Sequence, residues 1–225
     1  PVAEEATGDD AAAIADEAEA EAAPATEPAA TALPPTLGVV GVGINPAFEP
    51  FVFMDENGQL VGFDVDLVNA LATTGNFEVG YTQTSFGGLF DGLTSDAFDI
   101  AVGAITVTDE RKQIVDFTDP YYRSGQSPLS FFDAGQGIAV PSDNSTIFLP
   151  DDLTAEMRVG VKASTTGERF VVDETAAEFV RYPEAPDALA ALAGGEIDAV
   201  VVDIPVITDY VRKNPDAGIK LTGGP

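Results

Sequence analysis

Two cations and one carboxylate stand directly after stretches of sequence that read as buried strands. Arg111 comes after "FDIAVGAI", Lys162 ends "MRVGVK", and Asp203 ends "EIDAVVVD". Arg111 is also the first positive charge in the chain, because residues 1–110 contain 20 Asp and Glu and no Lys or Arg. Ligands of open α/β sheets bind at the carboxyl ends of the strands, so these side chains are candidates for a binding site.

Small, hydroxyl-bearing and aromatic residues follow the same predicted strands. A Thr-rich turn before the helix predicted over 165–177 would point free N–H groups toward an anion. Two loop phenylalanines could hold an apolar stem between their faces. The residues that follow the strands, charged ones included, are Asn45, Phe48, Ser85, Phe86, Gly103, Ala104, Thr106, Arg111, Lys162, Ser164, Thr165, Thr166, Gly167 and Asp203.

These groups suit a zwitterion. The guanidinium of Arg111 offers a bidentate fork to a carboxylate, which binds more strongly than a point charge. The carboxylate of Asp203 could take an ammonium group. If Arg111 and Asp203 belong to two different lobes of the fold, closure of the lobes would depend on a ligand that bridges these two charges.

The same residues also have ordinary structural interpretations. An Arg in the first turn of a helix is usually a solvated surface charge, and lysines at strand ends are common. Asp203 could cap the helix that follows it. Phe48 and Phe86 could belong to the core.

The elements that would position these residues alternate between strands and helices. This order indicates an α/β fold with a mainly parallel sheet. We expect a loop over 45–51, a helix over 62–75 that stops at Gly75, and a short helix over 108–114 capped by Thr108 or Asp109. The further expected strands cover 37–44, 77–83, 98–105, 115–118, 157–162, 179–182 and 196–203, and the further expected helices cover 85–97, 165–177, 185–195 and 204–214.

Composition excludes several classes of function. A formal net charge of −28 argues against nucleic acid or an anionic membrane surface as a partner, since both need a basic patch. The chain contains no Cys and no His, which removes disulfides, thiolate sites, the commonest general base and the commonest metal ligand. We expect no cofactor and no metal.

The 225 residues allow two lobes of about 100 residues each. We predict lobe one over 37–125, lobe two over 126–220, and the start of a return segment to lobe one over 221–225. Residues 1–36 are rich in Ala, Pro and acids, so we expect a disordered linker that serves as a tether or as a dispensable spacer. The segment "GQGIAVPSDN" has no interpretation at this level.

Four segments resemble the extracellular solute-binding proteins of polar amino-acid ABC transporters, the family-3 group that includes the glutamine-binding protein. They are "NPAFEPFVF…GQLVGFDVDLVNALA", "FDGLTSDAFDIAVGAITVTDERKQIVDFTDPYYRSG", "VGVKASTTGE" and "GEIDAVVVDIP". The resemblance implies a two-lobe, type II periplasmic-binding-protein (Venus-flytrap) architecture. It also implies that lobe one is incomplete here, because members of the family continue past "GGP".

The resemblance also implies a role for each candidate. Arg111 would bind the ligand carboxylate with Thr106 and the backbone at Ala104, and Asp203 would bind its ammonium. Gly103 is a further expected ligand-binding residue. Phe48 and Phe86 would form the aromatic platform, and Lys162, Thr166 and Gly167 a contact segment of lobe two. Glutamine binders usually have an acid where Asn45 stands and a histidine where Val202 stands. A neutral Asn45 beside Lys162 disfavours a cationic ligand, so we expect glutamine, glutamate or another uncharged polar amino acid.

The predicted function is therefore that of the substrate-binding component of an amino-acid importer, and not of an enzyme. Its expected partners are a free amino acid and a membrane permease. We expect a periplasmic or extracellular monomer, tethered through the N-terminal linker, with a lipid anchor upstream of Pro1 as one option. The alternatives are a cyclohexadienyl dehydratase-like enzyme and the ligand-sensing domain of a receptor.

Overall fold

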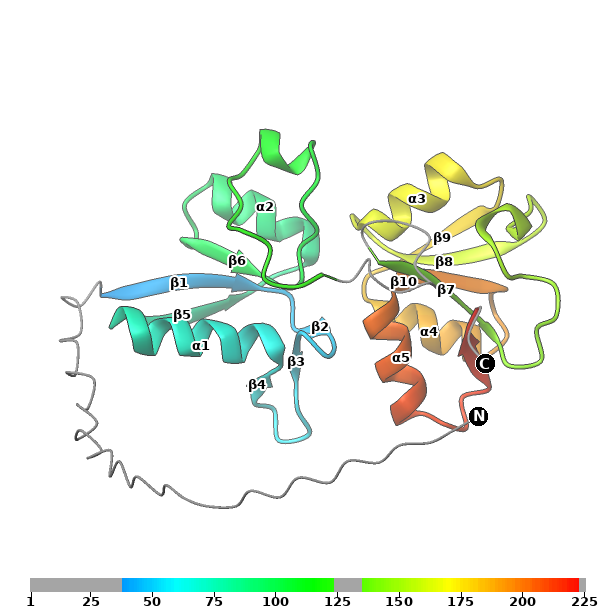
Figure 1. Ribbon diagram of the computed structural model, residues 1–225, viewed down its shortest axis with the longest axis horizontal. Helices are drawn as coiled ribbons and strands as arrows, with labels where there is room; N and C mark the ends of the chain where they lie inside the picture. Colours follow the sequence, from blue (N-terminus) through cyan, green and yellow to red (C-terminus); the bar gives the residue numbers. More distant parts are fainter. Residues whose placement is uncertain (1–37, 124–134, 223–225) are drawn as a thin grey trace, which may run out of the picture. The chain divides into compact units, whose positions relative to one another are not determined.

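The computed structural model describes residues 38–123 and 135–222. These two stretches hold separate sheets (Figure 1), and we refer to residues 38–123 as lobe one and residues 135–222 as lobe two. The prediction for residues 1–36 and the segment that joins the lobes lie outside the described residues.

Lobe one contains a three-stranded parallel sheet in the order β5-β1-β6. Its strands are β1 (Val39–Ile44), β5 (Glu78–Gln83) and β6 (Ile100–Val102). Helices α1 (Phe63–Gly75) and α2 (Phe86–Thr94) connect them and cover opposite faces of the sheet (Figure 1). The first crossover runs from β1 to β5 and the second runs back from β5 to β6, so two right-handed connections place their helices on opposite faces. The carboxyl ends of the three strands therefore meet at one edge.

A small antiparallel sheet follows β1. It consists of β2 (Ala47–Phe48), β3 (Val52–Met54) and β4 (Leu60–Val61), in that order. The prediction of a loop over 45–51 is wrong at β2, where Ala47 and Phe48 pair with Phe53 and Val52. A strand of two residues is too short for an alternating pattern to reveal it.

Lobe two contains a five-stranded sheet in the order β11-β7-β10-β8-β9. Strands β8 (Arg158–Lys162), β9 (Glu178–Tyr182) and β10 (Ala199–Asp203) are parallel, as expected. Strands β7 (Gln136–Pro141) and β11 (Ile219–Leu221) run antiparallel to their neighbours, which makes the sheet mixed. The uninterpreted segment "GQGIAVPSDN" thus supplies an interior strand, and Leu221 extends the sheet one residue past the predicted boundary at 220.

The helices of lobe two follow the predicted segments closely. They are α3 (Thr166–Glu174), α4 (Ala185–Ala193) and α5 (Ile204–Lys213), and a short 3-10 turn, η2 (Pro150–Asp152), precedes β8. Helix α3 is capped at its N-terminus by Thr165, whose hydroxyl accepts a hydrogen bond from the N–H of Glu168. It ends at Glu174, three residues earlier than predicted, because Thr175 adopts an extended conformation.

Three further expectations differ in detail. Helix α1 ends at Gly75, but the left-handed residue that terminates it is Asn76. The short helix near residue 110 is a 3-10 turn, η1 (Arg111–Gln113), and the hydroxyl of Thr108 accepts from the N–H of Arg111 at 3.2 Å. Residues 115–118 form no strand and have no partner strand within the described stretches, so the strand prediction there is wrong.

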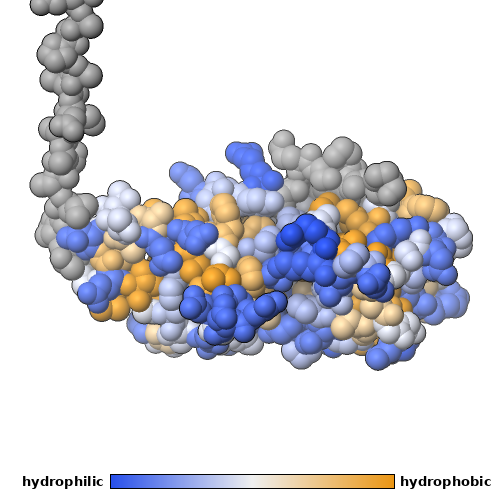
Figure 2. Space-filling view, turned by 90° about the horizontal axis from the view of Figure 1, so that it is seen from below, coloured by the Kyte–Doolittle hydropathy of each residue, from blue (hydrophilic) through white to orange (hydrophobic). Residues whose placement is uncertain are grey.

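The two lobes pack against each other through one hydrophobic cluster. Ile44, Phe48 and Val52 of lobe one belong to the same buried cluster as Leu189 and Val206 of lobe two. A second cluster lies between the lobe-two sheet and α3. Hydrophilic and hydrophobic residues alternate in patches on the face shown in Figure 2. The shared cluster holds the ends of β1, β6 and β10 close enough to form one site.

Candidate functional site

Eight of the predicted binding residues line one cleft between the lobes. They come from β2, the start of α2, the loop between β6 and η1, the start of α3 and the end of β10. The lining side chains nearly close the cleft, whose free volume of ≈ 10 Å³ is about what a single water molecule needs. The lining residues are Phe48, Phe86, Gly103, Ala104, Thr106, Arg111, Thr165, Thr166 and Asp203. Thr165 was among the strand-end residues, but no ligand-binding role had been predicted for it.

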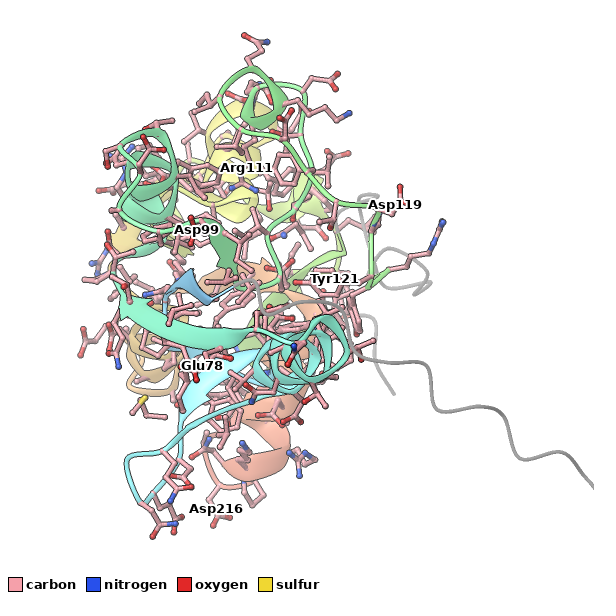
Figure 3. All side chains as sticks on the ribbon, turned by 90° about the vertical axis from the view of Figure 1, so that its left-hand side faces the viewer. Glu78, Asp99, Arg111, Asp119, Tyr121 and Asp216 are labelled. Carbon is pink, nitrogen blue, oxygen red and sulfur yellow. The ribbon has the colours of Figure 1, made fainter. Side chains whose placement is uncertain are left out.

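Arg111 reaches across the cleft instead of pointing to solvent. Its Nη1 donates to the carbonyl of Thr106 at 2.8 Å, and its Nη2 donates to the carbonyl of Ser164 in lobe two at 3.3 Å. The guanidinium lies 5.2 Å from the ring centres of both Phe86 and Phe90. Figure 3 shows the side chain directed inward, whereas Asp119 lies at the periphery. The solvated-charge interpretation of Arg111 therefore does not hold.

Arg111 and Asp203 are close enough to affect each other's pKa. Burial lowers the pKa of Arg111, and the nearby Asp203 carboxylate opposes this shift. Burial raises the pKa of Asp203 to about 7, against the opposing effects of its own backbone N–H, of Arg111 and of Lys162. The side chain of Asp203 makes no capping hydrogen bond to α5, so the helix-cap interpretation also fails.

Gln136 supports the Asp203 side of the cleft, and the sequence reasoning missed it. Gln136 is 2% exposed and lies directly opposite Asp203 in the antiparallel register of β7 and β10. Its amide nitrogen donates to Asp203 Oδ1 at 2.9 Å and to the hydroxyl of Thr166 at 3.0 Å. The apolar run that follows Gln136, bounded by Gly135 and Pro141, was the signal that could have located this strand.

Lys162 and Asn45 form a buried cluster behind the aromatic rings. Lys162 is 1% exposed, and its ammonium donates to Asn45 Oδ1 at 2.5 Å. The same nitrogen lies 2.9 Å from Glu184 Oε2, 4.9 Å from the ring centre of Phe48 and 5.5 Å from that of Phe86. Burial lowers the pKa of Lys162, and the charges of Glu184 and Asp203 oppose that shift.

Glu184 was also missed, although it follows β9 at the edge where the other candidates lie. Applying the strand-end criterion to β9 would have found it. Its Oε1 accepts from the amide of Asn45 at 3.0 Å, and that amide also donates to the carbonyl of Thr84 at 3.2 Å. Lys162, Asn45 and Glu184 therefore form a connected polar network that joins the lobes.

Gly167 lies against β10 and Gln136 and does not line the cleft. A Cβ atom at Gly167 would come within 2.8 Å of the carbonyl oxygen of Val201 and 2.9 Å of Gln136 Oε1. A side chain at this position would therefore push α3 away from β10. The absence of a side chain lets the N-terminus of α3 approach the sheet.

Asp64 holds the turn that carries Gly103 and Ala104, and no sequence pattern had pointed to it. Its Oδ2 accepts from the N–H of Ala104 at 2.7 Å, and the hydroxyl of Tyr121 donates to the same carboxylate. Ala104 has a φ of 49°, a left-handed conformation that costs energy for a residue with a Cβ. Burial raises the pKa of Asp64, which is fully buried.

Among the described residues, no group of three or more His, Cys, Asp or Glu side chains could hold a metal ion. No helix in residues 38–123 or 135–222 is long and apolar enough to cross a membrane. The side chains that line the cleft are charged, hydroxyl-bearing and aromatic, and the backbone at Gly103 and Ala104 lies between them; such groups suit recognition of a small charged molecule.

Residues 40–165 match the bacterial extracellular solute-binding proteins, family 3. The chain belongs to this family. The predicted resemblance is thus confirmed, and so is the two-lobe type II architecture, since it agrees with the fold of solved family members.

Individual relatives are named after amino acids. A probable histidine-binding protein of Neisseria gonorrhoeae is 35% identical over 184 residues, which cover 80% of this chain and 65% of the relative. Two solved structures of an ancestral arginine-binding protein, one bound to arginine and one bound to glutamine, are each 36% identical with a TM-score of 0.75. They cover 83% and 84% of this chain, which in turn covers 79% of each of them. This family-3 chain spans about two thirds of the length of the curated relatives it matches.

Proposed function

We propose that this family-3 chain binds one free polar amino acid in the cleft between its lobes. The observation that carries the proposal is that Arg111 of lobe one and Asp203 of lobe two line the same small cleft. A cation and an acid placed in this way match the two ends of a zwitterion. The relatives named after amino acids support the same ligand class.

In this proposal Arg111 and Asp203 bind different ends of the amino acid. Arg111 binds the α-carboxylate, because its guanidinium is held in the cleft by the carbonyls of Thr106 and Ser164. Thr166 at the start of α3 supplies a backbone N–H to the same carboxylate. Asp203 accepts the α-ammonium, and the backbone at Gly103 and Ala104 lines the cleft beside it.

The end of the cleft next to Phe48, Phe86 and Lys162 favours a ligand whose side chain is uncharged or acidic. Phe48 and Phe86 would hold the stem of the ligand, and the Lys162 ammonium already lies over both rings. A guanidinium or ammonium of the ligand would have to share these rings with a buried cation. Glutamine and glutamate therefore fit better than arginine or lysine.

Ligand binding is coupled to closure of the lobes. The proposed contacts come from both lobes, so the ligand makes all of them only in the closed state and stabilises that state. A micromolar dissociation constant corresponds to about 8 kcal/mol. One bidentate ion pair, one ammonium site and two aromatic contacts can supply this amount.

We further propose that the closed form delivers the amino acid to the permease of an ABC importer outside the cytoplasm. Membership of the extracellular solute-binding family supports this role and location. A monomer, tethered through residues 1–36, would suffice because both poles of the site lie in one chain.

Calorimetric titration with the twenty amino acids tests the proposal. We expect saturable binding of at least one polar amino acid, and its loss in Arg111→Ala. Lys112→Ala is the matched control, because Lys112 is adjacent to Arg111, is exposed, and pairs with the exposed Asp109 at the surface. If the folded wild-type protein binds none of the amino acids, the proposal is wrong.

Catalysis on the same scaffold is the second candidate. The raised pKa of Asp203, about 7, is the observation that would suit an acid or base in the cleft. Binding remains the better proposal, since Asp203 is already committed to Gln136 and to balancing Arg111. Formation of product from prephenate or arogenate would decide for an enzyme.

A further inference from the structure

We propose that Glu184 is a specificity-determining residue, which neutralises Lys162 so that the cleft selects a neutral amide side chain over a carboxylate. Within the ligand class proposed above, this means glutamine over glutamate. The inference rests on the proposed function, because it concerns the side-chain end of the same cleft. It makes a charge pair inside the protein responsible for the choice of ligand.

The first argument comes from the hydrogen-bonding capacity of Lys162. An ammonium group has three N–H donors. One is taken by Asn45 Oδ1 and a second faces Glu184 Oε2 at 2.9 Å. The third has no oxygen acceptor within the described stretches, and the ammonium also makes cation–π contacts with Phe48 and Phe86. Because the nitrogen lies over Phe48 and Phe86, which both line the cleft, this donor can serve an acceptor on the ligand side chain.

The second argument is the net charge at this end of the cleft. Lys162 is 1% exposed and the side chain of Glu184 is 26% exposed, so water screens their charges only weakly. Together they contribute one positive and one negative charge. An amide oxygen on the ligand can accept from Lys162 without adding charge. A ligand carboxylate would instead bring a second acid close to Glu184, and like charges at such short range disfavour the ionised form.

Asn45 keeps the pair in this arrangement. Its oxygen accepts from Lys162, and its amide donates to both Glu184 Oε1 and the carbonyl of Thr84. The amide is therefore fully used within the protein, which leaves Lys162 as the group of the network with a free donor. Without Glu184, the same ammonium would lose its adjacent acid and keep the weaker interaction with the charge of Asp203, so this end of the cleft would favour an anionic ligand more strongly.

The test compares dissociation constants for glutamine and glutamate by calorimetry at pH 8. The wild-type protein should bind glutamine more tightly. Glu184→Gln should shift the ratio of the two constants toward glutamate by roughly tenfold or more, since one nearby charge is typically worth at least that much in a partly buried site. Glu178→Gln at the opposite end of β9, where the side chain is exposed, should leave the ratio unchanged.

A double variant separates charge from folding effects. Glu184→Gln alone leaves a buried cation without its acid and could fail to fold. Lys162→Gln combined with Glu184→Gln removes both charges, so it should fold and prefer glutamine again. Glu184→Asp, which keeps the charge, should also keep the glutamine preference.

Each contrary result has a distinct meaning. An unchanged ratio in folded Glu184→Gln, or a double variant that prefers glutamate, would overturn the role of Glu184. A wild-type protein that prefers glutamate or arginine would overturn it too, while leaving amino-acid binding intact. A wild-type protein that binds no amino acid would refute the proposed function itself.

Discussion

The amide nitrogen of Gln136 donates a hydrogen bond to Asp203 Oδ1 at 2.9 Å, from the position directly opposite it in the sheet. The same nitrogen donates to the hydroxyl of Thr166 at 3.0 Å. One buried side chain on β7 therefore fixes two residues of the cleft that come from β10 and α3. In the proposed complex Asp203 binds the ammonium of the amino acid and Thr166 binds its carboxylate. Gln136 therefore sets the distance between the two lobe-two residues that bind the ligand.

The first prediction concerns this positioning. Gln136→Leu should weaken amino-acid binding by about tenfold or more, because a hydrogen bond to a charged group contributes roughly 1.5–3 kcal/mol. Loss of a donor to the carboxylate should also raise the pKa of Asp203 and move the pH midpoint of binding upward. Calorimetry between pH 5.5 and 8.5 measures both effects.

The exposed Gln59 provides the control for this experiment. Gln59→Leu should change neither the affinity nor the pH midpoint, since its side chain lies in the exposed turn before β4. A Gln136→Leu protein with reduced affinity but an unshifted midpoint would indicate a packing role for Gln136 only.

The second prediction is a pH dependence of binding. An ammonium ligand prefers the ionised form of Asp203, whose pKa in the empty protein is raised to about 7 by burial. As pH falls below about 7, the dissociation constant should rise by up to ~tenfold per unit, and binding should release a proton. Titrations in buffers with different ionisation enthalpies count that proton. A dissociation constant that stays constant from pH 5.5 to 8 would contradict this assignment.

Ionisation of Asp203 favours ligand binding, but it lowers the free energy of unfolding of the ligand-free protein. Folded Asp203 keeps its proton to a higher pH than the unfolded chain does, where the pKa is near 3.8. Between these two values the native state binds more protons, so the contribution of Asp203 to the free energy of unfolding falls as pH rises from about 4 to about 7. Saturating ligand should offset this loss, and Asp203→Asn should remove the pH-dependent contribution.

Local patterns in the sequence located most of the elements that form the cleft. The strand-end criterion found Arg111 and Asp203, since both follow apolar runs whose ends are visible in the sequence. Helix α1 was predictable from apolar residues at helical spacing. These features depend on residues near one another in the chain, and for this reason a single sequence reveals them.

The partners that hold these residues in place were not predictable in the same way. Gln136 acts on Asp203 across 67 positions, through an antiparallel register that no local pattern encodes. Asp64 acts on Ala104 across 40 positions. Residues 115–118 had the composition of a strand, but strand formation requires a neighbour, and composition does not supply one.

The third prediction concerns Asp64. Asp64→Ala leaves the N–H of Ala104 without its acceptor, which should lower the free energy of unfolding by about 1–3 kcal/mol. The turn at Gly103 and Ala104 should then lose its left-handed geometry, so amino-acid affinity should fall as well. Urea unfolding and calorimetry measure the two effects.

Asp66→Ala is the matched control for Asp64, because Asp66 lies on the same helix and is exposed. We expect it to change the free energy of unfolding by less than about 0.5 kcal/mol. A stable Asp64→Ala protein with normal affinity would show that the Ala104 turn holds its conformation without the carboxylate.

The fourth prediction concerns ion pairs that join the lobes outside the cleft. Arg169 of lobe two lies 2.6 Å from Glu110 of lobe one, and Lys213 of lobe two contacts Glu49 of lobe one. In a chain with a net charge of −28, acids on both lobes repel one another, so cations that bridge them favour closure. The Arg169→Ala, Lys213→Ala double variant should therefore be more open without ligand, with a larger radius of gyration in small-angle scattering.

The solvent exposure of the ion pairs limits how much the double variant can change the closure of the lobes. The side chains of Arg169 and Glu110 are 58% and 55% exposed, so we expect each bridge to contribute at most about 1 kcal/mol to closure. Loss of both bridges should lower amino-acid affinity by no more than about thirtyfold. Salt at 1 M should remove the difference from the wild-type protein, because it screens exposed charges over about 3 Å. Arg212→Ala is the control, since Arg212 pairs with Asp209 within α5 and connects no lobes. If the double variant scatters like the wild-type protein at low salt, packing of the shared hydrophobic cluster alone keeps the lobes together.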